Sequence, residues 1–219
     1  MTSDEVADAL AVLRGRIAMV ERSWTHDVRI VGVTKGHGPW AIEAAHMVGV
    51  DAIGENYAQE VVAKRPTIER LRPEVQFIGQ LQTNKVRPLA GLVDVWASLD
   101  RPSVVVEVAR RAPGARVLIQ VDTVGERGKG GCRVDDVRGL VDLARVHDLR
   151  VEGLMTVGPT GAPPEEARPG FGLVRSLVDE LGLGVCSMGM SADLEIAVEA
   201  GATEVRIGSL LFGPRTVRR

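Results

Sequence analysis

The sequence predicts an α/β fold: a single-domain (β/α)8 TIM barrel spanning residues 1–219, with an extra N-terminal helix. Three observations support this prediction. Eight short apolar runs alternate with helix-like segments, no Pro- or Ser-rich linker divides the 219 residues, and 45% of the residues are hydrophobic. Because alternating strands and helices pair in parallel with right-handed crossovers, eight such units favour a closed barrel over an open, doubly wound sheet.

The elements follow from hydrophobic periodicity. An amphipathic helix is expected over residues 4–24, where apolar side chains recur at three- and four-residue steps. The predicted strands are Val28–Val33, Asp51–Ile53, Val75–Ile78, Val93–Trp96, Arg116–Val121, Val151–Met155, Gly184–Met188 and Glu204–Ile207. The predicted helices between them lie near 39–48, 56–64, 83–90, 101–111, 134–147, 167–181 and 192–200. The stretch 158–170 is rich in Gly and Pro and is expected to be a loop, either on the functional rim or on plain surface.

Composition limits the function classes. The formal net charge of -2 argues against general nucleic-acid binding, and the basic tail at 215–219 is interpreted as a solvated end. No apolar run reaches the roughly 18 residues of a membrane span. The N-terminus does not resemble a signal peptide, and two cysteines do not make a disulfide framework, so we expect a cytoplasmic protein. The four histidines lack metal-ligand spacing, so no metal is expected.

Functional side chains in a barrel gather where strands end. Lys35 ends an apolar strand. There it would either point into the barrel mouth, where burial favours a neutral amine able to form a Schiff base, or lie on the surface with its charge in water. Asn56 would either cap the next helix or reach a ligand. Arg206 lies within an apolar strand and would pair with a structural carboxylate or face a ligand. Only four lysines occur, against 23 arginines, so a lysine here indicates a position where arginine would not serve, such as one that needs a neutral amine.

The last quarter of the chain predicts an anion site. Small and hydroxyl residues follow the seventh and eighth strands, whose loops form the usual phosphate site of such barrels. Ser191 is expected to cap the helix over 192–200. Because Asp193 falls in the first turn of that helix, the phosphate is placed to one side, between 187–189 and 208–209. Two capped turns without a ligand are the alternative.

Six stretches of the chain, in order along nearly its whole length, match one protein family. They are VGVTKGHGPW at 31–40, GENYAQE at 54–60, FIGQLQTNK at 77–85, QVDTVGERGKGG at 120–131, GLMTV at 153–157 and CSMGMSADLEIAVEAGATEVRIGSLLFGPR at 186–215. These stretches resemble the pyridoxal-phosphate homeostasis proteins, which have the barrel of the alanine-racemase group without that group's second domain. In one departure, His37 stands where the family often has a second lysine.

The resemblance implies a site for pyridoxal 5′-phosphate (PLP). Lys35 would carry the cofactor as a Schiff base, Arg206 would meet the pyridine nitrogen, and residues after the seventh and eighth strands would hold the phosphate. The full set of implied residues is Lys35, Asn56, Met155, Ser187, Met188, Gly189, Arg206, Gly208 and Ser209.

The same residues favour a carrier over a catalyst. A guanidinium is always charged and only donates, so it would leave the pyridine nitrogen unprotonated and weaken the ring as an electron sink. Racemases of this group take a second base, a tyrosine, from the domain that is missing here, and Tyr57 is the single tyrosine. We therefore expect a monomeric PLP homeostasis protein without robust catalysis, with PLP-dependent apo-enzymes as possible recipients. The alternatives are a PLP-dependent amino-acid racemase or lyase, and a barrel whose Lys35 forms imines with sugar phosphates.

Overall fold

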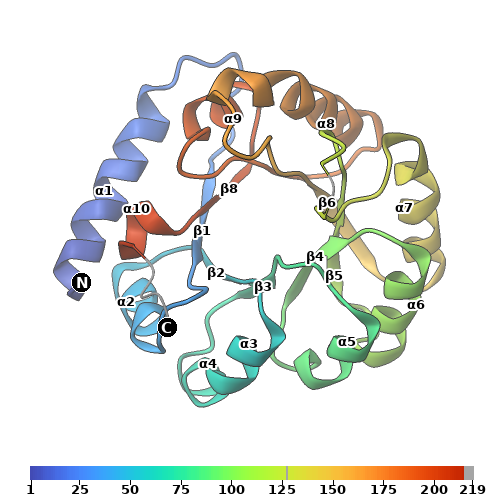
Figure 1. Cartoon of the computed structure of the whole chain (residues 1–219), viewed down its shortest axis with the longest axis horizontal. Helices are drawn as coiled ribbons and strands as arrows, with labels where there is room; N and C mark the ends of the chain where they lie inside the picture. The colour runs from blue at the N-terminus through green and yellow to red at the C-terminus, as the bar shows by residue number, and fades with distance from the viewer. Residues whose placement is uncertain (127, 215–219) are drawn as a thin grey trace.

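The protein is an eight-stranded parallel barrel surrounded by helices (Figure 1), seen in a computed structural model that describes residues 1–126 and 128–214. Neighbouring strands follow chain order, and β8 pairs with β1 to close the barrel. The strands are β1 (Arg29–Val33), β2 (Ala52–Glu55), β3 (Val75–Phe77), β4 (Val95–Leu99), β5 (Arg116–Gln120), β6 (Arg150–Met155), β7 (Val185–Ser187) and β8 (Glu204–Ile207). The predicted barrel is confirmed. The tail at 215–219 lies outside the described residues.

Helices cover the outside of the barrel and account for most of the remaining chain. They are α1 (Ser3–Met19), α2 (Trp40–Val48), α3 (Ala58–Ala63), α4 (Arg65–Leu71), α5 (Thr83–Leu89), α6 (Pro102–Arg111), α7 (Val137–Val146), α8 (Arg168–Glu180), α9 (Leu194–Glu199) and α10 (Ser209–Phe212), with 3-10 turns at Val134–Asp136 and Pro164–Ala167. Within the described residues, none of these helices has the length and apolar character needed to cross a membrane.

The extra N-terminal helix is present but ends at Met19, earlier than predicted. It begins with a capping box, in which Thr2 Oγ1 accepts from Glu5 N and the Glu5 carboxylate accepts from Thr2 N. Beyond the helix, Trp24 stacks on His26 with ring centroids 3.8 Å apart and packs against the core. Trp24 therefore packs against the core from outside the helix, which ends before the apolar pattern does.

Two short helices, α4 and α10, were not predicted. Pro66 lies in the first turn of α4, where its missing N–H would have no helical partner in any case, so it does not break the helix. The start of α9 also differs from expectation. Its N-cap is Asp193 instead of Ser191, and Asp193 Oδ1 accepts a hydrogen bond of 2.6 Å from Met190 N.

Strand side chains alternate between the helical layer and the barrel interior. Outward residues such as Ile30, Phe77 and Trp96 belong to the main core between strands and helices. Some of the inward-facing residues make a separate apolar cluster, composed of Val95, Ala97, Leu118 and Met155.

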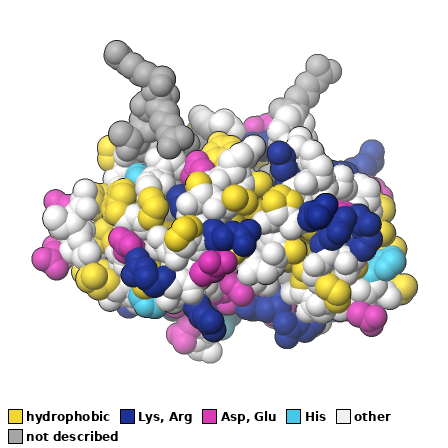
Figure 2. All heavy atoms as spheres, turned by 90° about the horizontal axis from the view of Figure 1, so that it is seen from below, with side chains coloured by type: hydrophobic (Ala, Val, Ile, Leu, Met, Phe, Trp, Pro, Cys, Tyr) yellow, Lys and Arg dark blue, Asp and Glu magenta, His cyan; other side chains and the backbone are white. Residues whose placement is uncertain are grey.

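The outer surface carries both signs of charge side by side, as Figure 2 shows for one face. Ion pairs such as Arg110–Glu107 and Arg175–Asp179 join neighbouring turns of one helix. Exposed pairs of this kind are worth only about 0–1 kcal/mol each. The stability of the barrel therefore depends mainly on its packed layers.

We expect Gly153→Ala in β6 to lower the free energy of unfolding by about 1–3 kcal/mol, because β7 must move to accept the methyl group. A Cβ at Gly153 would lie 1.9 Å from Val185 O and 2.5 Å from Val185 Cβ. Urea denaturation measures the change. The control is Gly139→Ala in α7, where a Cβ meets nothing within 4 Å and should be neutral or stabilise by up to about 1 kcal/mol. Equal effects of the two substitutions would contradict the close β6–β7 contact.

Candidate functional site

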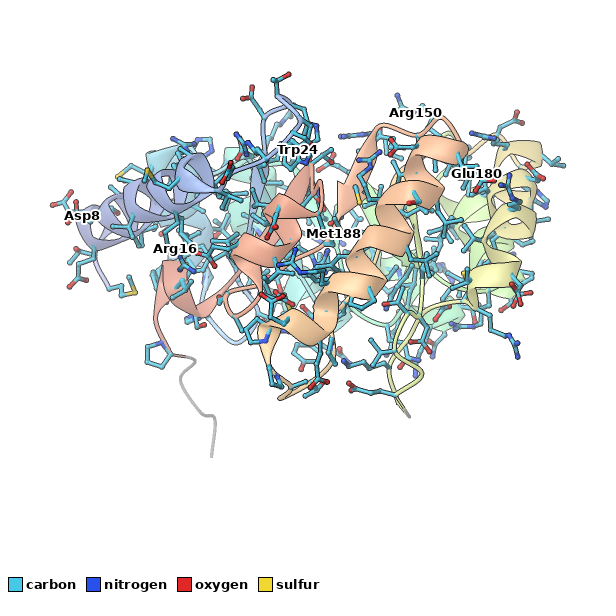
Figure 3. The ribbon with its side chains drawn as sticks, turned by 90° about the horizontal axis from the view of Figure 1, so that it is seen from above. Asp8, Arg16, Trp24, Arg150, Glu180 and Met188 are labelled. Atoms are coloured by element: carbon cyan, nitrogen blue, oxygen red, sulfur yellow. The ribbon has the colours of Figure 1, made fainter. Side chains whose placement is uncertain are left out.

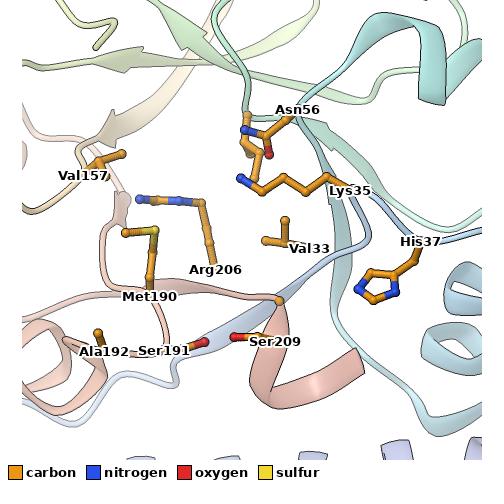
Figure 4. Close-up of a pocket in the computed structure, with 12 residues that line it drawn as sticks. Val33, Lys35, His37, Asn56, Val157, Met190, Ser191, Ala192, Arg206 and Ser209 are labelled. Atoms are coloured by element: carbon orange, nitrogen blue, oxygen red, sulfur yellow. The ribbon is translucent and has the colours of Figure 1, made fainter. Parts of the chain in front are cut away.

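The carboxyl ends of the strands open onto one cavity of about 360 Å³ (Figure 4). Its walls come from β1, β8 and the segments that follow β1, β2, β3, β6, β7 and β8. The lining residues are Val33, Lys35, His37, Asn56, Ile78, Val157, Met190, Ser191, Ala192, Arg206, Gly208 and Ser209. A cavity of this size at this end of a barrel suits a small organic ligand.

Lys35 extends into this cavity from the turn after β1. The turn is defined by two backbone hydrogen bonds, from Thr34 N to Gly54 O (3.1 Å) and from His37 N to Thr34 O (3.1 Å). Gly36 adopts a φ of 74°, which glycine accepts without strain. Figure 4 shows the Lys35 amine between the side chains of Asn56 and Arg206. The structure thus places Lys35 in the barrel mouth and not on the outer surface.

Asn56 presents a buried acceptor without a partner. Its backbone packs closely against Gly79, where an added Cβ would lie only 2.0 Å from Asn56 O. The residue does not cap α3, whose N-cap is Tyr57 and has no side-chain cap. Asn56 Oδ1 is buried and has no hydrogen-bond partner among the described residues. Leaving such a group unpaired costs about 1–3 kcal/mol, and because Asn56 lines the cavity, its oxygen can accept a hydrogen bond from a donor there.

Arg206 is buried in β8 and faces the cavity from below. Its Nη1 donates to Ser187 Oγ (2.8 Å) and its Nη2 to Thr156 O (2.6 Å). Ser187 Oγ in turn donates to Glu204 Oε1 (2.8 Å), and Gln76 Nε2 donates to Glu204 Oε2 (2.7 Å). Burial lowers the pKa of Arg206 and raises the pKa of Glu204, while the charge of each opposes the shift of the other. Arg206 is therefore linked to a structural carboxylate, Glu204, and also lines the cavity. Both of the roles that the sequence left open apply to it.

The rim of the cavity is suited to an anion. Ser191 and Ala192 contribute from the loop after β7, and Gly208 and Ser209 from the start of α10. Figure 4 shows the hydroxyl groups of Ser191 and Ser209 turned toward one another. The first N–H groups of a helix have no partner within the helix, so they are available to a phosphate group.

Four of the predicted residues do not reach the cavity. Met155 lies in the interior cluster, and Ser187 is fully buried between Arg206 and Glu204. Met188 belongs to the layer between the barrel and its helices (Figure 3). Gly189 has its carbonyl bonded to Arg206 N (2.9 Å).

This difference has a simple cause. The chain stays paired with β8 as far as Gly189, through Met188 N to Glu204 O (3.0 Å) and Arg206 N to Gly189 O. The loop that reaches the rim therefore begins later, at Met190. The segments that line the rim are therefore 190–192 and 208–209, and residues 187–189, which were expected at the phosphate, do not line the cavity.

The sequence did not predict several of the lining residues as ligand contacts. They are Val33, His37, Ile78, Val157, Met190, Ser191 and Ala192. Apart from Val33, the last residue of β1, all of them follow a strand, which is the signal that could have found them. Most of these residues are apolar or small, so their side chains do not indicate a functional role in the sequence.

We expect Ser187→Ala to lower the free energy of unfolding by about 1–3 kcal/mol, because Glu204 Oε1 and Arg206 Nη1 both lose a buried partner. Urea denaturation measures this change. Ser176→Ala is the matched control, since Ser176 is exposed on α8 and its hydroxyl donates to Gly172 O within the same helix. The control should stay within about 0.5 kcal/mol of the unchanged protein. A neutral Ser187→Ala would show that the hydroxyl does not bridge the two charges.

Comparison with known proteins agrees with this architecture. Residues 9–216 match the family model described as alanine racemase, N-terminal domain. The chain is 40% identical over 198 residues to the pyridoxal phosphate homeostasis protein of Aquifex aeolicus, covering 85% of this chain and 87% of that one. It is 34% identical over 220 residues to the protein of the same name from Pseudomonas aeruginosa, covering 96% of each.

A solved structure extends the likeness to three dimensions. PipY of Synechococcus elongatus PCC7942, determined with PLP bound, matches with a TM-score of 0.82 and 30% identity, covering 95% of this chain and 100% of that one. The chain therefore belongs to the pyridoxal phosphate homeostasis protein family, whose barrel is the alanine racemase N-terminal domain.

Proposed function

We propose that this protein binds PLP at the barrel mouth and serves intracellular PLP homeostasis, holding the cofactor covalently but reversibly on Lys35. The observation that carries the proposal is the convergence of Lys35, Asn56, Arg206 and the turn at 208–209 on one cavity. The names of its relatives and the PLP-bound PipY structure support the choice of ligand.

The residues present fit each part of this cofactor. PLP supplies an aldehyde that condenses with amines and, in enzymes, a ring that withdraws electrons. The Lys35 amine would react with the aldehyde. Ser191, Ser209 and the start of α10 would bind the phosphate. Asn56 Oδ1, which has no hydrogen-bond partner among the described residues, would accept a hydrogen bond from a donor on the bound molecule.

Lys35 acts in this proposal as a nucleophile. In its neutral form the amine would add to the aldehyde carbon, and a C=N bond would form as the aldehyde oxygen leaves with the two amine hydrogens as water. Attack by water reverses the step and returns the free amine. The attachment is therefore reversible without any further group from the protein.

Arg206 supports holding over catalysis. Ser187 and Thr156 fix the guanidinium, which only donates hydrogen bonds and so supplies no proton to a ring nitrogen placed against it. His37 also lines the cavity, and Figure 4 places its ring away from the Lys35 amine. The alternative, a PLP-dependent racemase, requires rapid inversion of a D- or L-amino acid, and that result would contradict the carrier proposal.

We expect Lys35→Ala to abolish covalent attachment of PLP while leaving weaker binding through the rim. The absorbance spectrum before and after borohydride reduction, with mass spectrometry of the reduced peptide, measures attachment. Lys85→Ala on α5, outside the cavity, is the matched control and should keep the adduct at Lys35. An adduct that persists in Lys35→Ala would remove the basis of the proposal.

We expect Ser209→Asp to weaken PLP binding by about tenfold or more, because a carboxylate near a phosphate costs on the order of 1–4 kcal/mol. Pyridoxal, which lacks the phosphate, should bind as before. Titration with each ligand, followed by absorbance, separates the two cases. Ser23→Asp is the control, since Ser23 is exposed and precedes β1 at the opposite end of the barrel. Equal losses for both ligands would mean that the phosphate lies elsewhere.

A further inference from the structure

A second lysine, Lys64, is buried behind the turn that carries Lys35. It follows α3, and its side chain is only 4% exposed. Its Nζ donates to Thr34 O (2.8 Å), Glu55 Oε1 (2.6 Å) and Glu60 Oε2 (3.1 Å). Thr34 is the residue directly before Lys35, so the Lys64 ammonium holds the chain at the start of the turn.

The same network also holds the residue after Lys35. Gly36 N donates to Glu60 Oε2 (2.9 Å), the oxygen that Lys64 contacts. Thr34 Oγ1 donates to Glu55 Oε1 (2.5 Å), which Lys64 contacts as well. The backbone on each side of Lys35 is therefore tied to one buried cluster whose centre is the Lys64 ammonium.

The contacts argue against a role for Lys64 as another amine that reacts with aldehydes. Three oxygen acceptors match the three N–H bonds of an ammonium, so the site is built for the charged form, which has no lone pair. Lys64 is also absent from the cavity lining. Burial raises the pKa of Glu55, and the charge of Lys64 opposes that shift, so the two groups compensate each other.

Stability alone does not account for this cluster. A buried ion pair is often no more stabilising than apolar residues of the same volume, because both charges lose their water. The cluster does fix the geometry of the four-residue turn. Lys64 holds the Thr34 carbonyl, and Glu60 holds the Gly36 N–H.

We infer that Lys64 is a positioning residue, which fixes the turn at 34–37 so that the Lys35 amine enters the cavity. The inference rests on the proposed function, because it concerns the reaction of Lys35 with the aldehyde of PLP. It predicts a selective effect. Lys64 governs the condensation at Lys35, whereas recognition of the phosphate by Ser191 and Ser209 does not depend on it.

The test compares two ligands that differ at one carbon. PLP carries the aldehyde, and pyridoxine 5′-phosphate carries an alcohol there and depends on ring and phosphate contacts alone. We expect Lys64→Met to weaken PLP binding by about tenfold or more, the scale of a small displacement of reacting groups, with unchanged affinity for pyridoxine 5′-phosphate. Lys64→Arg keeps the charge and should restore part of the PLP affinity. The matched control is Arg65→Met, because Arg65 is the neighbouring cation and is 47% exposed.

A second variant keeps the inference testable if Lys64→Met does not fold. Glu60→Gln keeps the volume of a partly exposed side chain but removes its charge from Lys64, so it should lower PLP affinity in the same selective way, by a smaller factor. Equal losses for the two ligands, no loss for either, or a borohydride adduct on Lys64 in the unchanged protein would each overturn the inference. Failure of the unchanged protein to bind PLP would instead overturn the proposed function.

Discussion

Pairing of β8 with β1 is the constraint on which the whole site depends. The register sets Val31 beside Arg206 and Gly32 beside Ile207, so the ends of the first and last strands emerge together. Lys35 therefore leaves β1 next to the turn that begins at Gly208. In an open, doubly wound sheet the first and last strands need not be neighbours, and the amine and the anion rim would then be separated. Closure brings together residues from the two ends of the chain.

The barrel interior combines this closure with buried charge. Arg206 near the mouth is linked through a serine hydroxyl to Glu204, and Arg29 approaches Glu204 from the other end at 3.8 Å. Although burial would raise the pKa of Glu74, hydrogen bonds from Arg116 and Arg29 lower it overall. Glu204 and Arg206 are almost fully buried, and a buried ion costs several kcal/mol unless it meets a partner, so these two charges have few alternative arrangements. The polar interior thus fixes the direction of the guanidinium at the cavity floor.

The sequence predicted the parts of this structure that depend on local pattern. Eight apolar runs became eight strands, and Lys35 and Arg206 were found because polar residues stand out at the end of, or within, such runs. Ser187 was expected at the phosphate because the loop was expected to begin there. Pairing with β8 instead continues past Ser187, and no local sequence signal shows this. The role of Lys64 was also invisible. Its position four residues after Glu60 can be read from the sequence, but the Thr34 carbonyl comes from another βα unit.

Exposure around the cavity bears on the choice between holding a ligand and transforming it. The floor is closed, with Arg206 only 4% exposed, whereas Ser209, Ala192 and Met190 on the rim are exposed. Enzymes that depend on a reactive intermediate gain from a site that excludes water, because water diverts the intermediate. The proposed reversible attachment of an aldehyde to the Lys35 amine would, by contrast, need water to reach the C=N bond. A fixed floor and an exposed rim are therefore consistent with the proposed role, in which the ligand is oriented by the protein and can return to solution.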